Sequence, residues 1–389
     1  MKKTSVILLV FMSLQFINAQ ENRVISTGVP FLLIAADARS AGMGDQGVAT
    51  SADAFSQQFN PAKYAFALDK QGFSVSYTPY LTGLANDISL GQVTYYNRIN
   101  ERSAFAGSLR YFGLGEIILT NDFAEELGTV NPNEFAIDGS YSLTLIDNRF
   151  SMAVAGRYIR SNLRFPDNNN DATAANTFAV DVAGFYQSEE VAYTDFSGRW
   201  RAGFNLQNLG PKISYDKDNI SDNFIPANLR LGGSYDFIFD EFNKVSLNLE
   251  FAKLLVPTPQ DSDLNGDGTP TDEEKTQNAN AYRRIGWTKG IFKSFGDAPG
   301  GFSEELKEVT YSVGSEYVYQ DSFAFRLGYF HESPVKGARK FFTLGAGFKY
   351  SAVKVDVSYL FSASKVRNPL ENTLRFSLSF NFGEKYDEY

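Results

Sequence analysis

The stretch 374–382 reads Leu374-Arg375-Phe376-Ser377-Leu378-Ser379-Phe380-Asn381-Phe382, and its side chains alternate strictly between apolar and polar. Successive side chains of a β-strand point to opposite faces, so one face of this segment is wholly apolar and the other wholly polar. Residues 245–251, 323–329 and 353–359 repeat the pattern. Long strands with one apolar face are typical both of a soluble β-sandwich and of a membrane barrel.

Segments of this kind predict fourteen strands, and the lengths of the connections between them distinguish the two folds. The second, fourth, eighth, tenth and twelfth connections are tight, whereas the third, fifth, seventh and ninth are long. Barrels with short periplasmic turns and long outer loops show this parity, and a sandwich has no reason to. The first connection is shorter than this rule predicts, and the sixth is longer. The expected strands lie near residues 72–81, 86–98, 103–113, 134–145, 149–162, 176–187, 198–208, 226–238, 243–255, 308–319, 322–332, 340–350, 352–362 and 372–382.

The sequence therefore predicts an all-β fold, a fourteen-stranded antiparallel transmembrane β-barrel over residues 71–389 with a long extracellular loop at 256–307. The apolar faces would contact outer-membrane lipid, and the polar faces would line the lumen. Charges of both signs on the polar faces predict a packed, hydrogen-bonded interior, because buried charges need partners. The expected lumenal charges are Arg110, Arg157, Arg201, Arg230, Glu250, Glu316, Arg326, Asp356 and Arg375.

Composition agrees with a barrel and excludes several other classes of protein. The 389 residues include 35 Phe, 21 Tyr and no Cys, with a formal net charge of −9. Without cysteine there are no disulfides, thiolate metal sites or thiol nucleophiles. An acidic isoelectric point near 4.9 argues against nucleic acid as a partner. A mean hydropathy of −0.25 argues against a bundle of apolar membrane helices.

The first nineteen residues have the features of a secretory signal peptide. Lys2 and Lys3 are basic, residues 6–12 are apolar, and Ala19 is a small residue suited to cleavage. The apolar run is too short to span about 30 Å of hydrocarbon. We therefore expect an exported protein, located in an outer membrane with its N-terminus in the periplasm.

Residues 20–70 do not alternate, and we expect them to form an N-terminal periplasmic or plug segment. The run from Arg39 to Ala49 contains Gly42, Met43 and Gly44 and is dense in small residues, which let backbones pack closely. Asn60-Pro61 supplies a turn signal. The run is not a phosphate-binding loop, because no strand precedes it and no Gly-Lys-Ser/Thr follows.

The Arg39-Ser40-Ala41-Gly42-Met43-Gly44 motif, the later Gly47-Val48-Ala49 and Phe59-Asn60-Pro61-Ala62 resemble the N-terminal region of FadL-type outer-membrane barrels. That resemblance implies fourteen strands and a lumenal plug. The stretch 294–306, which contains Asp297-Ala298-Pro299-Gly300-Gly301-Phe302-Ser303-Glu304-Glu305-Leu306, is similar to a loop signature of the PorV family of type IX secretion in Bacteroidetes.

The PorV resemblance implies a partner-binding protein and not an enzyme. Its expected partners are the large outer-membrane translocon barrel, secreted proteins that carry a C-terminal sorting domain, and the sortase-like attachment complex at the cell surface. The expected function is to receive cargo at the translocon and carry it to that complex. The alternative is a FadL-type transporter of hydrophobic small molecules, which would have a continuous apolar tunnel and a movable plug. No cofactor is required by either function.

The acidic loop at 261–272 is a candidate calcium site. Oxygen-bearing side chains occupy EF-hand positions 1, 3 and 5, and Gly266 occupies position 6. Position 12 is an aspartate where a bidentate glutamate is usual, so a solvated acidic turn remains the alternative. The candidate ligands are Asp261, Asp263, Asn265, Asp267 and Asp272.

The same loop carries apolar side chains that suggest a partner-binding surface. Four of them can share one face of a short helix, and such patches mark interfaces or close over a small core of their own. The candidate residues are Ile285, Trp287, Ile291, Phe292 and Phe295. His331 is the only histidine, and no serine lies in a nucleophile motif, so we expect no catalytic residues.

Overall fold

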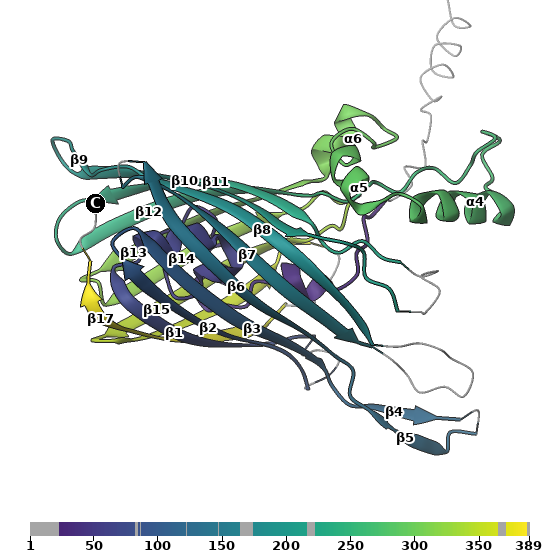
Figure 1. Cartoon of the computed structure of the whole chain (residues 1–389), viewed down its shortest axis with the longest axis horizontal. Helices are drawn as coiled ribbons and strands as arrows, with labels where there is room; N and C mark the ends of the chain where they lie inside the picture. The colour runs from purple at the N-terminus through teal and green to yellow at the C-terminus, as the bar shows by residue number, and fades with distance from the viewer. Residues whose placement is uncertain are drawn as a thin grey trace, which may run out of the picture.

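The computed structural model describes residues 23–386, apart from 82–84, 86, 122, 147, 164–173, 216–221 and 365–370. Fourteen antiparallel strands form a closed barrel, in which β17 (Leu374–Lys385) pairs with β1 (Asp69–Pro79) (Figure 1). The predicted barrel is confirmed. The intervening strands are β2 (Ile88–Asn100), β3 (Ser103–Leu114), β6 (Asn133–Ile146), β7 (Phe150–Asn162), β8 (Ala175–Gln187), β10 (Ser197–Leu209), β11 (Asn228–Ile238), β12 (Asn243–Leu254), β13 (Val309–Tyr319), β14 (Phe323–His331), β15 (Lys340–Tyr350) and β16 (Val353–Ser362).

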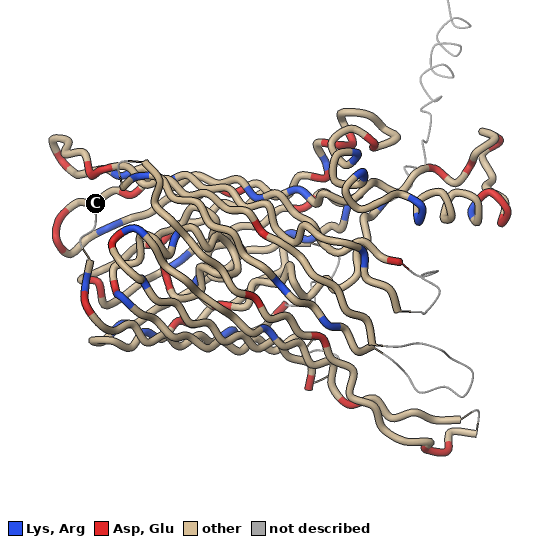
Figure 2. Tube along the Cα trace, viewed as in Figure 1, with Lys and Arg blue, Asp and Glu red and all other residues tan. Residues whose placement is uncertain are grey.

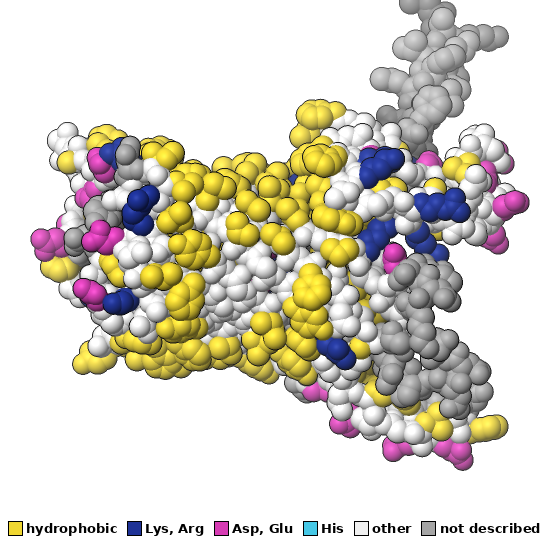
Figure 3. Space-filling view, viewed as in Figure 1, with side chains coloured by type: hydrophobic (Ala, Val, Ile, Leu, Met, Phe, Trp, Pro, Cys, Tyr) yellow, Lys and Arg dark blue, Asp and Glu magenta, His cyan; other side chains and the backbone are white. Residues whose placement is uncertain are grey.

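The outer wall is apolar and the interior is polar, which is the reverse of a soluble protein. On β1, Phe73, Val75 and Tyr77 are exposed, whereas Ser74 and Ser76 are buried. Apolar side chains cover much of the visible wall, and charged side chains gather at the two ends (Figure 3). Lys, Arg, Asp and Glu also lie along the strands (Figure 2). Because a chain in water does not cover its surface in this way, the apolar wall is a lipid-facing surface.

Long connections leave one end of the barrel and tight turns close the other (Figure 1). The third connection forms a separate hairpin of β4 (Ile117–Thr120) and β5 (Glu126–Val130). The ninth contains the helices α4 (Asp272–Arg283), α5 (Trp287–Lys293) and α6 (Phe302–Lys307). The sixth connection lies at the tight-turn end and is longer because β9 (Val191–Ala192) pairs with the start of β10.

The chain before β1 lies inside the barrel and contains four short helices: η1 (Pro30–Leu33), α2 (Ala38–Ala41), α3 (Ser56–Phe59) and η2 (Pro61–Phe66) (Figure 1). We call residues 23–68 the plug. Helix α2 packs on β15 to β17, and η2 packs on β2, β3, β6, β7 and β8. Among the described residues, no helix is long and apolar enough to cross a membrane.

The predicted signal peptide falls outside the described residues. Arg23, the first residue described, lies at the long-loop end, where it forms ion pairs with Asp261 and Glu304 of the ninth connection. The expected periplasmic N-terminus therefore finds no support in the position of Arg23. The rule that places the tight turns in the periplasm places the long-loop end of the barrel at the cell surface.

Candidate functional site

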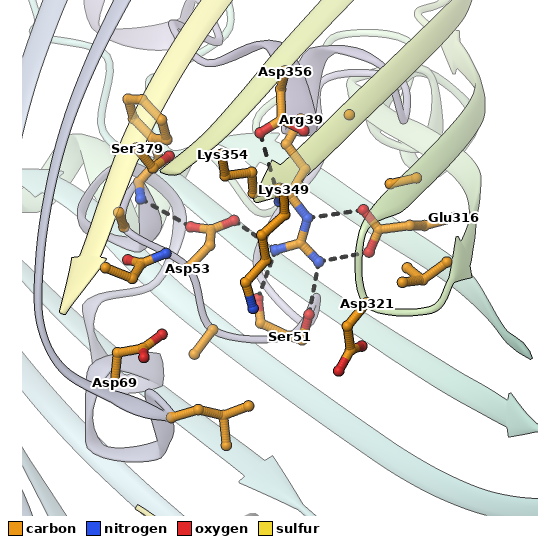
Figure 4. A pocket seen from close by; sticks show the side chains of 18 of the residues that line it. Arg39, Ser51, Asp53, Asp69, Glu316, Asp321, Lys349, Lys354, Asp356 and Ser379 are labelled. Atoms are coloured by element: carbon orange, nitrogen blue, oxygen red, sulfur yellow. Dashed lines mark hydrogen bonds and ion pairs between the residues drawn. The ribbon is translucent and has the colours of Figure 1, made fainter. Parts of the chain in front are cut away.

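The central feature of the lumen is a buried ion-pair cluster that ties the plug to the barrel wall (Figure 4). The guanidinium of Arg39 forms a bidentate contact with Glu316 of β13, at 3.0 Å from Nε and 2.8 Å from Nη2. Its Nη1 lies 2.6 Å from Asp53, farther along the plug. Glu316 also accepts from Arg326 of β14 at 2.6 Å, and Arg326 contacts Asp356 of β16 at 2.8 Å. One plug arginine is thus held by carboxylates from both plug and wall.

The glycines of the plug motif allow the plug backbone to lie directly on the barrel backbone. A Cβ on Gly42 would lie 3.0 Å from the Cα of Gly345 on β15. Gly44 has a φ of 83°, and a Cβ there would lie 2.9 Å from the carbonyl oxygen of Tyr329. Met43 between them is fully buried. The small residues in this motif therefore serve close packing, as the sequence predicted.

A second contact joins the plug to β11 and β12. The backbone N–H groups of Gly47 and Val48 both donate to one oxygen of Glu250, at 2.8 and 2.9 Å. The other oxygen of Glu250 accepts from Arg230 at 2.6 Å. Because this carboxylate is buried, the two amides and the arginine provide the partners that its charge requires.

The Asn-Pro turn joins the two halves of the plug. Asn60 caps η2 by accepting from the Ala62 N–H at 3.0 Å, and Pro61 occupies the first position of that helix. The Asn60 amide donates to the carbonyls of Val48 and Gly184, so it also binds the plug to β8. The six predicted plug-motif residues are all buried, and Arg39, Gly42, Gly44 and Asn60 contact the wall.

Cavities lie on both sides of the plug. One of about 180 Å³ opens at the tight-turn end and is lined by Arg39, Asp53, Lys349 and Lys354 among others (Figure 4). A larger one of about 550 Å³ lies at the long-loop end. Its lining mixes apolar residues, such as Ile25, Leu33 and Phe330, with charged ones. The predicted lumenal charges thus form part of a packed interior, as expected. The described part of the plug lies between the two cavities.

At the long-loop end, α6 is fastened to the barrel by a group of buried charges, which we call the loop clamp. It consists of Glu304, Glu305, Glu308, Lys253 and Lys336. Lys253 of β12 contacts Glu305 and Glu308 at 3.0 and 2.6 Å. Lys336 contacts Glu304 and Glu308 at 2.7 and 2.9 Å. Residues 294–306 were recognised in the sequence as a signature, but these ion pairs were not predicted.

The rest of the signature shapes the start of α6. Gly301, with a φ of 67°, is the N-cap residue, a conformation that a side chain would strain. Glu304 and Glu305 accept from the N–H groups of Gly300 and Ala298 at 2.7 and 2.8 Å. The glycines and glutamates therefore build one local structure whose carboxylates face the barrel.

The loop clamp should open in acid. Burial raises the pKa of Glu308, but hydrogen bonds from Lys253, Thr258 and Lys336 outweigh it and hold that pKa below the ordinary glutamate range. A lowered carboxylate pKa stabilises the fold above the ordinary value of about 4.3, and this stabilisation is lost as the pH falls through the lowered value. We expect hydrogen-exchange protection factors of the Ala298 and Gly300 amides to stay constant from pH 8 to 5 and to fall about tenfold by pH 3. The Glu308→Gln protein should show weaker protection than the wild type from pH 8 to 5, and the two proteins should converge as the pH falls to 3. Protection that persists unchanged at pH 3 in the wild type would contradict the clamp.

The predicted partner-binding residues separate into two groups. Ile285, Trp287 and Ile291 are half-buried, whereas Phe292 and Phe295 are exposed. Two further residues, Phe302 and Leu306 on α6, are also exposed. Phe292 and Phe302 are 80% and 77% exposed, values that are unusual for phenylalanine. We call the four residues Phe292, Phe295, Phe302 and Leu306 the outer apolar patch.

The candidate calcium loop shows carboxylates turned toward its own backbone. Asp263 accepts from the N–H groups of Gly266, Asp267 and Gly268, at 2.8, 3.2 and 2.7 Å. Asp272 lies in the first turn of α4, 3.3 Å from Lys275. Within the described ranges, no three acidic or histidine side chains are grouped so as to hold a metal ion. Calcium binding by Asp261, Asp263, Asn265, Asp267 and Asp272 therefore stays a prediction.

His331 lies at the end of β14 among aromatic rings. It stacks on Tyr311 with ring centroids 4.7 Å apart, and its Nδ1 lies 3.2 Å from the Tyr329 hydroxyl. These contacts are those of an aromatic residue at the rim of a lipid-facing wall.

A closed fourteen-stranded barrel with an apolar wall, a polar lumen and an inserted N-terminal plug defines an outer-membrane β-barrel protein. Residues 17–261 match the family described as "Type IX secretion system protein PorV". This match spans more than half of the chain, and the chain belongs to that family. The protein is therefore an outer-membrane component of type IX secretion.

Solved structures of outer-membrane channels and transporters are similar to this chain. The monoaromatic hydrocarbon channel CymD is 14% identical, with a TM-score of 0.50 over 92% of this chain and 99% of that one. The toluene transporter TbuX of Ralstonia pickettii is 12% identical, with a TM-score of 0.49 over 91% and 100% of the chains. A FadL homologue of Pseudomonas aeruginosa is 12% identical, with a TM-score of 0.44 over 92% and 99%. No curated protein matches the chain significantly.

Proposed function

We propose that the protein associates with the translocon barrel of a Bacteroidetes type IX secretion system, binds the C-terminal domain of secreted cargo, and transfers the cargo to the surface attachment complex. The family match is the observation that carries this proposal. The plug supports it, because Arg39 and Glu250 fix the plug to the wall through buried charged contacts. A protein that only presents binding surfaces has no need for an open lumen.

We assign the translocon contact to the outer apolar patch. The loop clamp fixes α6 on the barrel, so Phe302 and Leu306 project from a rigid base. Rigid, exposed aromatic residues are the side chains from which stable interfaces obtain most of their binding energy. The side chains of the outer apolar patch need no polar partner, and the exposure of its three phenylalanine rings to water is unfavourable.

The test is affinity purification from native outer membrane in mild detergent, with mass spectrometry. The wild-type chain should recover a very large barrel protein and cargo. Replacing Phe292 and Phe302 with Ser should reduce recovery of the large barrel at least tenfold, because two hot-spot contacts are lost. The matched control replaces Phe239 and Phe242 with Ser; these residues are also exposed, at 52% and 51%, but lie in a tight turn at the opposite end.

Full recovery of the large barrel by the Phe292→Ser/Phe302→Ser protein would refute the role of the patch. Recovery of the wild-type chain alone in several detergents would refute the association itself.

The 550 Å³ cavity favours a second function, transport of a hydrophobic small molecule. Against it, Arg230, Glu250 and Lys336 contribute charge to the lining, which an apolar ligand would leave without water. A transporter should retain fatty acid or detergent in this cavity after purification, which mass spectrometry of the extracted protein would detect.

A further inference from the structure

The hairpin formed by β4 and β5 extends beyond the rim of the barrel at the long-loop end (Figure 1). Ile117 pairs with Val130 and Ile118 pairs with Thr129 in an antiparallel register. Within the described residues, these two strands form a sheet of their own. Each strand therefore has one edge whose backbone groups have no strand partner.

The hairpin has no hydrophobic core of its own. Nearly all of its residues are exposed on both faces, including Phe123 at 85% and Leu127 at 67%. Asn121 organises the tip by accepting from the N–H groups of Phe123 and Glu125 at 2.9 and 3.0 Å. An isolated two-stranded hairpin is only marginally stable in water, so an apolar one of this kind gains most from a partner that covers it.

The base of the hairpin fixes its direction. Asp87 accepts from the Glu116 N–H at 2.7 Å, and the preceding residue, Gly115, has a φ of 81°. A side chain at Gly115 would lie 2.5 Å from Asp87. This turn, which only glycine fits, directs the hairpin away from the rim of the barrel. A soluble protein can therefore reach the hairpin without contacting the barrel wall.

The charge of the hairpin limits the kind of partner. Residues 115–132 contain four acidic residues and no Lys, Arg or His. Figure 3 shows apolar and acidic side chains together on this arm. An acidic arm is repelled by an anionic lipid surface and attracted to a basic or neutral protein segment. Its exposed edges suit an extended chain, because strand addition uses main-chain hydrogen bonds for affinity and alternate side chains for specificity.

We propose that β4 and β5 form the cargo-docking arm of this protein, which binds an extended, apolar and basic segment of the secreted protein by strand addition. Ile118 and Leu127 contact the alternate apolar side chains of that segment, and Phe123 covers its end. This inference rests on the proposed function, and it assigns cargo to a surface separate from the outer apolar patch.

The test uses the full-length protein in detergent, with a secreted substrate of the system that carries its C-terminal domain as the probe. A photo-crosslinking amino acid at Leu127 should capture the substrate, and the same group at Phe242 in a tight turn should not. Replacing Ile118 and Leu127 with Ser should weaken substrate binding at least tenfold, and raising the salt concentration should weaken wild-type binding. The Ile118→Ser/Leu127→Ser protein should still recover the translocon barrel in full.

The outcomes distinguish failure of the cargo-docking arm from failure of the proposed function. If the Ile118→Ser/Leu127→Ser protein retains both substrate and translocon, the arm is not the docking site, and the proposed function stands. If the wild-type protein binds neither, the proposed function fails. Crosslinks from Leu127 to the translocon, to a second copy of this chain or to lipid would overturn the assignment of the arm to cargo.

Discussion

Replacing Glu316 with Ala should lower the free energy of unfolding by about 3–5 kcal/mol, because it leaves the guanidinium groups of Arg39 and Arg326 facing each other without the carboxylate that they share. Both arginines are buried, so water is a poor replacement for the lost charge. Removing one member of a buried ion-pair network costs more than the network contributes in total, because the remaining charges stay in a medium of low polarity. Urea unfolding of the purified barrel in detergent micelles measures the change.

The matched variants separate loss of charge from loss of shape. Glu316→Gln retains an acceptor for Arg39 and should lose less stability than Glu316→Ala. Glu241 is an exposed carboxylate in a tight turn, and its replacement by Ala should change stability by less than about 0.5 kcal/mol. A Glu316→Ala protein as stable as the wild type would show that the plug does not depend on this cluster.

The same loss of contact should release the plug. Arg39 is held to the wall by Glu316, so we expect the Glu316→Ala barrel to conduct ions in planar bilayers more often than the wild type does. This result would also weaken the transporter alternative, because a plug that moves during transport should not need a buried network to hold it.

The barrel could be predicted from sequence because its period is local. Alternation at residues 374–382 depends only on which face meets lipid, and each of the fourteen strands carries it. The first and last strands were misplaced by up to three residues, as Asp69–Pro79 and Leu374–Lys385 differ from the predicted 72–81 and 372–382. The closing strands extend because Asp69 pairs with Lys385, and these polar ends carry no alternation that a sequence reading could detect.

The loop clamp could not be predicted, because its partners are distant in sequence. Lys253 and Glu305 are 52 residues apart, and the pairing of β12 with β13, which places Lys253 opposite Val309, brings them within 3.0 Å. Packing within the ninth connection was equally hidden from the sequence. Trp287 and Ile291 were predicted to bind a partner but are half-buried, whereas the exposed Phe302 and Leu306 were not predicted. The hairpin did have a local signal, the apolar run at 117–119 followed by a second short run after an acidic turn.

The glycines that face the plug and those that face lipid should respond oppositely to one added methyl group. Gly328 on β14 faces the plug, where a Cβ would lie 2.2 Å from the backbone nitrogen of Gly44. Gly156 on β7 lies next to exposed Val154 on the outer wall, and a Cβ there would meet no atom within 4 Å. The two glycines therefore differ in what a methyl group meets, although both lie within strands.

Replacing Gly328 with Ala should destabilise the barrel by about 1–3 kcal/mol, because the methyl group meets backbone that no rotamer change can move away. Replacing Gly156 with Ala should leave stability unchanged or raise it by about 0.5 kcal/mol, because alanine restricts the unfolded chain and costs nothing in the open site. Urea unfolding of both proteins in the same detergent gives the comparison, and bilayer conductance shows whether Gly328→Ala also dislodges the plug. Equal effects at the two positions would mean that the contact between Gly44 and β14 does not hold the plug in place, and that the buried charges hold it alone.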